Sequence, residues 1–304
     1  MMKKIAAALL AAATVLSFSA CGGTPAGSSA QSAAQGGRIK VSATFNAMAE
    51  FAKAVGKDKA DVSTIIPNGT EPHDFEPKGK DLAGLSDADV FVYNGFGMES
   101  WAEKAVSAAG NKKLVAVEAS KGATPIRSAE SGEGGQYDPH LWLSLKGAET
   151  EVKNICDAFV KADPDDADYF RKNSDAYVTQ LESLFTEYDK AFRSAKHKNF
   201  VTGHAAFAYL CRDFGLKQNS VEDVFAEGEP SARRLSELID YCKANNVKTV
   251  FVEDMVSPEV SETLAKQVGA SIKTIYTMES SEDGKSYLER MKTNLQEIGE
   301  SLQA

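Results

Sequence analysis

Histidines are scarce in this chain of 304 residues, and three of its four stand in loops that could present them to a metal ion. His73 lies in the acidic segment GTEPHDFEP, His140 in YDPHLWLS and His204 in FVTGHAAFAYL. The fourth, His197, lies between two lysines that would repel a cation, which indicates a solvated side chain. Imidazole is a common ligand of zinc, copper, iron and nickel. The other three histidines therefore form a candidate ligand set.

The segments that must position these histidines alternate between strand-like and helical patterns. Strands are predicted at 38–45, 61–66, 89–95, 113–119, 199–203, 216–222, 247–253 and 271–277. Helices are predicted at 47–56, 79–88, 99–110, 205–215, 231–246, 258–269 and 285–304, and one more follows His140. This alternation is typical of βαβ units. It predicts an α/β fold of two (β/α)4 lobes, each a mainly parallel sheet with helices on both faces.

One long helical pattern separates the two halves of the chain. Apolar residues recur mostly every three, four or seven positions, which is the helical period; they are Tyr169, Tyr177, Leu181, Leu184, Phe185, Tyr188 and Phe192. Pro164 suits a first helical turn. A helix of about 30 residues would be roughly 45 Å long. We expect it to be a rigid connection that lies against both lobes.

The order of these elements places the histidines near strand ends. His73 follows the second predicted strand, and His204 follows the fifth directly. Ligands of open α/β sheets bind outside the carboxyl ends of the strands. Three histidines in such places, drawn from both halves, favour a binding site over three unrelated loop residues.

The first residues have the layout of a secretory signal, with two lysines, a short apolar run and small residues before Cys21. The apolar run is shorter than the roughly 20 residues that span a bilayer. Its end, LSFSAC, resembles the bacterial lipoprotein signal and predicts lipidation of Cys21. Ordinary cleavage near Ala20 is the alternative.

A Gly/Ser/Ala-rich stretch follows and cannot build a core, so it predicts a flexible tether. The expected organisation is a signal peptide, a lipid-anchored tether, an N-terminal lobe, a linking helix and a C-terminal lobe. Their ranges are 1–20, 21–37, 38–163, 164–196 and 197–304, respectively. The protein would then be a membrane-anchored lipoprotein on the extracytoplasmic face.

Charge and cysteine content exclude other classes of protein. The net charge is -9, which argues against nucleic acid as a partner because phosphates require a basic surface. Cys156, Cys211 and Cys242 lie far apart with no CxxC pair, so a thiolate metal site is not expected. Each lies in a helical pattern and is predicted to be a small buried side chain. A bridge between Cys211 and Cys242 is the alternative.

Several blocks of the mature chain together resemble the zinc- and manganese-binding receptors of bacterial ABC importers. The blocks are PNGTEPHDFEP, DPHLWLS, FVTGHAAFAYLCRDFGL, GEPSARRLSEL and VFVEDMVSPEVSETLAKQVGA, in the order of that family. The resemblance implies two (β/α)4 lobes joined by a rigid helix, with a metal ion between them. It implies ligation by His73, His140, His204 and a carboxylate after the last strand. The histidine-rich loop of many relatives is replaced by IRSAESGEGGQYD.

The fourth ligand is expected to be Glu279, the first acid after the last predicted strand. Glu253, Asp254, Glu282, Asp283 and water are the alternatives. Three imidazoles favour Zn²⁺ over Mn²⁺, which prefers oxygen ligands. The nearby acids Glu71, Asp74 and Asp138 could orient an imidazole through its other nitrogen. Trp142 is expected to pack in the core.

The resemblance implies a monomeric receptor that is no enzyme and delivers Zn²⁺ to an ABC transporter permease. A zinc hydrolase remains an alternative, because three histidines and a nearby glutamate also suit a catalytic site with an open fourth position. The chain contains no HExxH motif. A surface adhesin with structural zinc is a second alternative.

Overall fold

The computed structural model describes residues 37–128, 136–225, 231–253, 257–281 and 283–303. The predicted signal peptide, the tether up to residue 36 and the lipidation position Cys21 lie outside this part of the chain. Within it, every helix is too short or too polar to cross a membrane.

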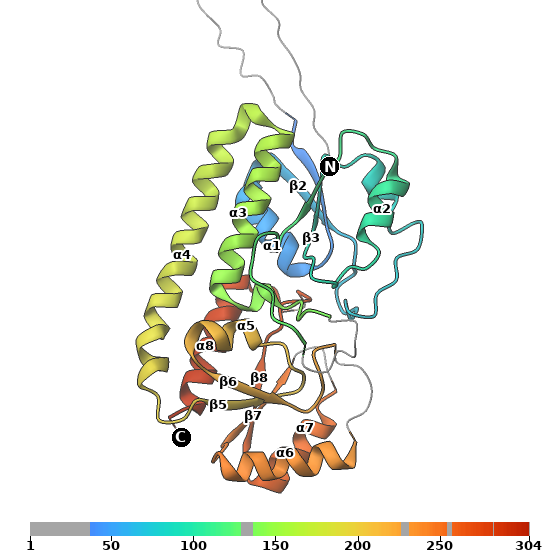
Figure 1. The fold of residues 1–304 in the computed structure, drawn as a ribbon. Helices are drawn as coiled ribbons and strands as arrows, with labels where there is room; N and C mark the ends of the chain where they lie inside the picture. The colour runs from blue at the N-terminus through green and yellow to red at the C-terminus, as the bar shows by residue number, and fades with distance from the viewer. Residues whose placement is uncertain (1–36, 129–135, 226–230, 254–256, 282, 304) are drawn as a thin grey trace, which may run out of the picture. The chain divides into compact units, whose positions relative to one another are not determined.

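The first sheet contains four parallel strands in the order β2-β1-β3-β4. They are β1 (Ile39–Ala43), β2 (Ala60–Thr64), β3 (Val90–Tyr93) and β4 (Val115–Glu118). The helices α1 (Asn46–Gly56) and α3 (Leu145–Ala162) pack on one face, and α2 (Ala102–Ala109) covers the other (Figure 1). Alternate residues of β3 serve the two faces: Val90 and Val92 join the α1/α3 core, whereas Phe91 packs below α2.

The second sheet repeats this topology with the strand order β6-β5-β7-β8, again all parallel. Its strands are β5 (Asn199–Thr202), β6 (Lys217–Ser220), β7 (Thr249–Glu253) and β8 (Ser271–Ile275). Its helices are α5 (Ala208–Phe214), α6 (Ala232–Ala244), α7 (Glu259–Val268) and α8 (Tyr287–Ser301). The predicted fold class of two four-stranded parallel lobes is therefore confirmed, and each predicted strand forms within a few residues of its expected bounds.

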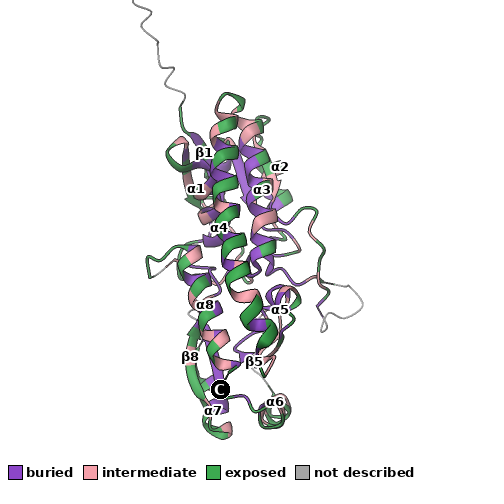
Figure 2. Ribbon diagram, turned by 90° about the vertical axis from the view of Figure 1, so that its left-hand side faces the viewer, coloured by how far each residue is buried: buried purple, intermediate pink, exposed green. Residues whose placement is uncertain are grey.

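The long helix α4 (Ala167–Ser194) connects the two halves, after a short 3₁₀ turn η4 (Pro164–Asp166). It packs against α3 in the first half and against α5 and α8 in the second (Figure 2). Its buried face includes Phe170, Leu181 and Phe192, while the opposite face is exposed. One continuous core contains residues of both sheets and of α4, so the lobes share packed side chains. The exact division of the chain at residues 163 and 196 stays a prediction.

One predicted helix is wrong. The segment 79–88 contains only the 3₁₀ turn η2 (Ala83–Ser86), and the shorter turns η1 (Lys57–Lys59) and η3 (Leu141–Leu143) complete the list of described 3₁₀ elements. Two glycines within the segment each cost roughly 1 kcal/mol in a helix. Asp81 also accepts a hydrogen bond from the backbone N–H of Lys78, at 2.8 Å, which favours a turn. Leu85 still reaches the core below α2.

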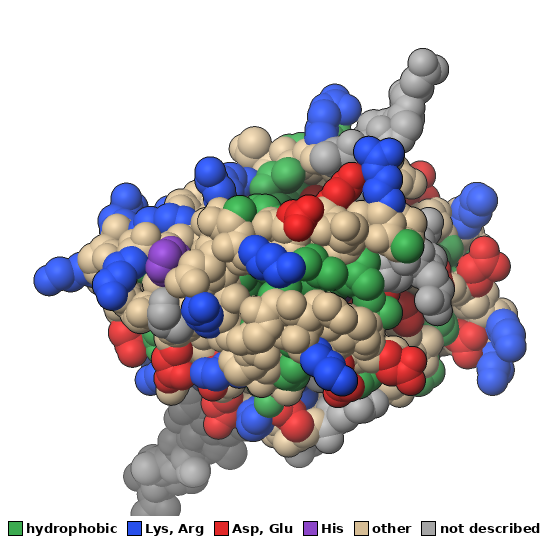
Figure 3. All heavy atoms as spheres, turned by 90° about the horizontal axis from the view of Figure 1, so that it is seen from below, with side chains coloured by type: hydrophobic (Ala, Val, Ile, Leu, Met, Phe, Trp, Pro, Cys, Tyr) green, Lys and Arg blue, Asp and Glu red, His purple; other side chains and the backbone are tan. Residues whose placement is uncertain are grey.

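The cysteines agree with their predicted role as small buried side chains. Cys156, Cys211 and Cys242 are buried and free, so the alternative bridge between Cys211 and Cys242 is not present. Figure 3 shows the molecule from below, with basic side chains gathered toward the left-hand end of this face and acidic and basic side chains mixed over the rest of it.

Candidate metal centre

Four side chains from four separate loops meet between the two sheets. His73 lies after β2, His140 immediately precedes η3, His204 follows β5 and Glu279 follows β8. One ligand atom from each lies within 4.8 Å of the other three. The Nε2 atom of His140 is 3.1 Å from Nε2 of His73 and 3.2 Å from Nε2 of His204. Among the residues that the structure describes, these three histidines and one glutamate are the group that could hold a metal ion.

Glu279 completes the group with one carboxylate oxygen. Its Oε1 atom is 3.5 Å from Nε2 of His73 and 3.8 Å from Nε2 of His140. The side chains of the four residues are at most 3% exposed. Oε1 has no hydrogen-bond partner among the described residues. A buried acceptor without a partner is costly, so this oxygen is aimed at a site that requires a cation or a donor.

The histidine at the centre of the group, His140, is held by Asp138. The carboxylate Oδ1 of Asp138 lies 2.9 Å from Nδ1 of the His140 ring and accepts the His140 backbone N–H at 2.9 Å. Nδ1 therefore carries the proton and donates it to Asp138, which leaves the Nε2 lone pair directed at the group. Asn94 in turn donates its side-chain amide to the carbonyl of Pro139, at 2.9 Å.

His204 has a comparable partner in Glu253, at the end of β7. Oε1 of Glu253 accepts the His204 backbone N–H at 3.0 Å and lies 3.6 Å from Nδ1 of its ring. The Glu253 side chain passes close to Gly203, the residue before His204. A Cβ atom on Gly203 would lie 1.9 Å from Oε2 of Glu253. Any larger residue at this position would require the Glu253 carboxylate to move. Glu253, one of the alternative fourth ligands, thus faces the back of the His204 ring, away from its Nε2.

The backbone around Glu279 is bound at every carbonyl from Tyr276 to Ser280. Two of the donors lie on α8, where the Asn294 side chain donates to the Tyr276 carbonyl and the Arg290 side chain donates to the Ser280 carbonyl. The other carbonyls are bound by the first half, because Trp142 Nε1 donates to Thr277 at 2.7 Å and Asn46 donates to both Met278 and Glu279. Met278 has a positive φ of 57°.

Burial and the concentration of charge shift the pKa values of the group. Burial, with the neighbouring imidazoles, lowers the pKa of His140 well below its usual value. Burial also acts against charge on His204, but the carboxylate of Glu253 outweighs it and raises the pKa of His204 to about 9. Burial tends to raise the pKa of Glu279, yet the His73 imidazole overcomes this and lowers it below the usual value. Burial raises the pKa of Asp138 to about 7.

The separations fit a small divalent ion. Zinc binds imidazole nitrogen and carboxylate oxygen at about 2.0–2.2 Å, so neighbouring ligand atoms of a tetrahedral site lie about 3.3 Å apart. Four of the six distances between the candidate ligand atoms, 3.1, 3.2, 3.5 and 3.8 Å, lie around this value, and the other two are within 4.8 Å. The donor set of three nitrogens and one oxygen also matches the preference of zinc.

The other acids named from the sequence lie in different environments. Glu71 accepts the backbone N–H of His73 at 3.2 Å, and burial together with Glu279 raises the pKa of Glu71. Asp74 is exposed, and Asp283 pairs with Arg290 and Lys285. Asp254 and Glu282 lie outside the described residues.

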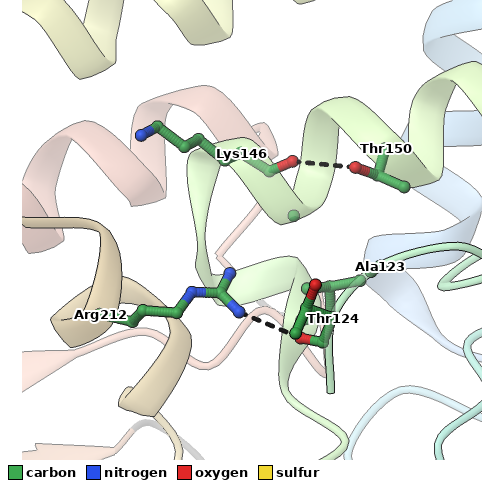
Figure 4. Close-up of a pocket in the computed structure, with 7 residues that line it drawn as sticks. Ala123, Thr124, Lys146, Thr150 and Arg212 are labelled. Atoms are coloured by element: carbon green, nitrogen blue, oxygen red, sulfur yellow. Dashed lines mark hydrogen bonds between the residues drawn. The ribbon is translucent and has the colours of Figure 1, made fainter. Parts of the chain in front are cut away.

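A separate hollow of about 340 Å³ lies where α3 meets α5, and it has a different character. Figure 4 shows its lining, with Arg212 donating to the carbonyl of Thr124 at 3.1 Å and Thr150 donating to the carbonyl of Lys146 at 3.2 Å. Lys146 also lies over the ring of Phe185. The lining residues include neither a histidine nor an acid. The hollow is therefore no candidate for a cation.

Sequence reasoning missed two residues of the centre. Thr277 donates its hydroxyl to Glu279 Oε2 at 2.6 Å, and Asn46 supports the Glu279 backbone from the opposite lobe. Thr277 stands two positions before Glu279, and Met278 between them has a positive φ of 57°, so the two side chains meet across a turn of the chain that follows β8. No pattern in the sequence indicates this contact. The contact of Asn46 with Met278 joins residues 232 positions apart, and no local pattern indicates it.

Comparisons with known proteins agree with this fold and group. Residues 41–301 match the family model described as "ZnuA: Zinc-uptake complex component A periplasmic". The chain belongs to this family of extracytoplasmic solute-binding receptors.

Individual relatives are similar over most of the chain. The high-affinity zinc uptake system protein ZnuA of Bacillus subtilis is 39% identical over 317 residues, covering 99% of each chain. The zinc-binding lipoprotein AdcA of Streptococcus pneumoniae is 36% identical over 86% of this chain and 55% of its own length. The solved laminin-binding protein Lmb of Streptococcus agalactiae, titled as bifunctional with adhesin and metal-transporting activity, has a TM-score of 0.81 and 37% identity. The structural match covers 87% of this chain and 99% of the Lmb chain.

Proposed function

We propose that this protein is a receptor that captures Zn²⁺ between its two lobes and delivers it to the permease of an ABC importer. The convergence of His73, His140, His204 and Glu279, within 4.8 Å of one another and enclosed by both lobes, is the observation that carries the proposal. When bound, the ion would neutralise the buried Glu279 carboxylate. The chain itself orients the His140 imidazole through Asp138, and Glu253 accepts the His204 backbone N–H, with its Oε1 atom 3.6 Å from Nδ1 of the His204 ring.

Zinc is the favoured ion because the donor set supplies three imidazoles and one carboxylate oxygen. Metal content after purification from unsupplemented medium, measured by mass spectrometry, tests this assignment. We expect one zinc per chain in the wild type and none in His140→Ala. A wild-type protein that contains manganese or iron in place of zinc would contradict the choice of ion.

We propose further that the protein binds zinc without catalysing a reaction. Glu279 Oε1 occupies the fourth position around the group, so a bound zinc would keep no open position for a nucleophilic water. A screen against ester, phosphate and peptide substrates should give no turnover that depends on His204. Turnover that His204→Ala abolishes would favour the hydrolase instead.

Attachment to the membrane through Cys21, as a monomer, belongs to the same proposal and rests on the N-terminal sequence. Cys21→Ser should release the protein from the membrane fraction, and metabolic labelling with a fatty acid should mark only the wild type. Deletion of the gene should slow growth in chelated medium, with rescue by zinc. Normal growth there, with loss of adhesion to host components, would favour the adhesin.

A further inference from the structure

The two carboxylate oxygens of Glu279 have different surroundings. Oε2 accepts a hydrogen bond from the hydroxyl of Thr277 at 2.6 Å. Oε1 has no hydrogen-bond partner in the described part of the chain and faces the imidazoles of His73 and His140. One oxygen is therefore directed at the metal centre, and the other is engaged by its own loop.

Thr277 is itself held firmly in place. Its side chain is buried, with the residue only 1% exposed, and its carbonyl accepts the indole N–H of Trp142 at 2.7 Å. The next residue, Met278, has a positive φ, and its carbonyl accepts the side-chain amide of Asn46 at 3.2 Å. A hydroxyl has one hydrogen to donate, and here it is donated to Glu279. The rotation of the carboxylate is thus fixed by a neighbour that cannot easily move.

The number of oxygens that a carboxylate offers affects which ion a site prefers. Zinc in a closed site takes four ligands in a tetrahedron. Manganese prefers six ligands rich in oxygen. A carboxylate that binds through both oxygens raises the ligand count from four to five and brings the site closer to the preference of manganese. The bond from Thr277 opposes that second contact, because Oε2 would have to give up a short hydrogen bond to a charged acceptor.

We infer that Thr277 is a specificity-determining, positioning residue that keeps Glu279 as a ligand through one oxygen and so favours a four-coordinate ion over a six-coordinate one. This inference rests on the proposed function, since it requires an ion bound by Glu279 and the three histidines. Thr277 would not contact the ion itself. It would act by holding the orientation of the Glu279 carboxylate.

The test uses Thr277→Val, which removes the hydroxyl at nearly constant shape, and Thr277→Ser, which retains it. Co²⁺ serves as the spectroscopic probe, because its visible absorption is strong in a tetrahedral site and weaker with five or six ligands. Competition titrations measure the ratio of Zn²⁺ to Mn²⁺ affinity in the full-length protein. Thr249→Val is the matched control, since Thr249 is a buried threonine of β7 whose hydroxyl lies 3.4 Å from that of Ser271.

We expect Thr277→Val to weaken the Co²⁺ absorption and to shift the Zn²⁺ to Mn²⁺ affinity ratio toward Mn²⁺ by about tenfold, the scale of one hydrogen bond to a charged group. Thr277→Ser and Thr249→Val should behave as the wild type. An unchanged spectrum and ratio in Thr277→Val, or an equal loss of affinity for both ions with an unchanged spectrum, would overturn the inference. If Thr277→Val does not fold, judged by thermal unfolding, Thr277→Ala provides the second hydroxyl-free variant.

The wild type and His204→Ala separate this inference from the proposed function. A wild-type Co²⁺ spectrum that is not tetrahedral, or one that His204→Ala leaves unchanged, would contradict the proposed metal centre itself. A tetrahedral wild-type spectrum that His204→Ala alters, together with no effect of Thr277→Val, would contradict only the role of Thr277.

Discussion

Glu279 and His204 both follow strands of the second sheet, but different parts of the molecule hold them. The Glu279 loop is bonded across the lobes by Asn46 and Trp142. His204 is held within its own lobe, where Glu253 accepts its backbone N–H and Gln218 donates to its carbonyl at 2.8 Å. The Glu279 loop is thus tied to both lobes, since Asn294 and Arg290 of α8 bind it as well. If the lobes separate, His204 is therefore the ligand expected to leave the other three first.

The difference also appears in charge. The pKa of His204 is raised to about 9 by its glutamate, whereas the pKa of Glu279 is lowered, so at neutral pH an ion must displace a proton from His204 but not from Glu279. His204 is thus the ligand whose binding is most sensitive to pH and to lobe position, and Glu279 is the more preorganised one.

Removal of His204 should have the largest effect. His204→Ala is expected to weaken zinc binding by more than about 1,000-fold, since loss of an outer partner alone costs 10- to 100-fold. It also leaves the Glu253 carboxylate buried without its imidazole. Calorimetric titration measures the affinity, and His197→Ala is the control with wild-type binding. A loss below about tenfold would contradict a ligand role for His204.

Acidification should have the next largest effect. A group whose pKa is raised to about 9 in the metal-free protein holds its proton below that pH, so zinc must displace one proton and its affinity falls about tenfold per pH unit. We expect a loss of about 100-fold or more between pH 7.5 and pH 5.5. Calorimetry in buffers with different ionisation enthalpies should detect release of about one proton at pH 7.5.

The variant Glu253→Gln sharpens this measurement. Without the carboxylate that raises the pKa of His204, the number of protons released on zinc binding at pH 7.5 should fall. Equal proton release in the two proteins would show that Glu253 does not control the charge of His204.

Removal of Glu279 should have a smaller effect than removal of His204. Glu279→Ala should leave zinc bound by three histidines, with affinity weakened by at least about 10- to 100-fold, the loss that an outer partner alone causes. Asp74→Ala is the matched control, because Asp74 is an exposed acid beside His73. Asp254→Ala should likewise change little. Equal, small effects of Glu279→Ala and Asp74→Ala would mean that another group closes the ligand set.

The smallest effect is expected from the support of the Glu279 loop. Asn46→Ala leaves the Met278 carbonyl without its side-chain donor, which should cost about 1–3 kcal/mol of unfolding free energy and up to about tenfold in zinc affinity. Asn173→Ala is the control, because Asn173 is a buried asparagine that donates to the carbonyl of Val55 at 3.0 Å, away from the centre. It should lose similar stability with unchanged zinc affinity. Unchanged affinity in both variants would show that the loop does not depend on Asn46.

Periodic patterns in the sequence were sufficient for most of the fold. Alternating strand and helix patterns predicted the eight strands, and the apolar stripe predicted a long connecting helix, because both depend on local backbone preference and burial. The failure at 79–88 has a local cause as well. An apolar pattern was present there, but two glycines and the turn at Asp81 disfavour a helix. Leu85 lies in the 3₁₀ turn η2, and its side chain is buried in the core below α2.

At the metal centre, local sequence features and long-range packing made different contributions. Residue type and position near strand ends indicated the three histidines as a candidate ligand set, since parallel strands direct such loops to one edge of a sheet. The family resemblance placed a carboxylate ligand after the last strand, where Glu279 is the first acid. The sequence left open whether Glu253 or Glu279 faces the histidines, because both acids end a strand. Packing decided this: Gly203 lets Glu253 pass behind His204, and the loop held by Asn46 and Trp142 turns Glu279 inward. These contacts join distant parts of the chain, and only the folded arrangement brings them together.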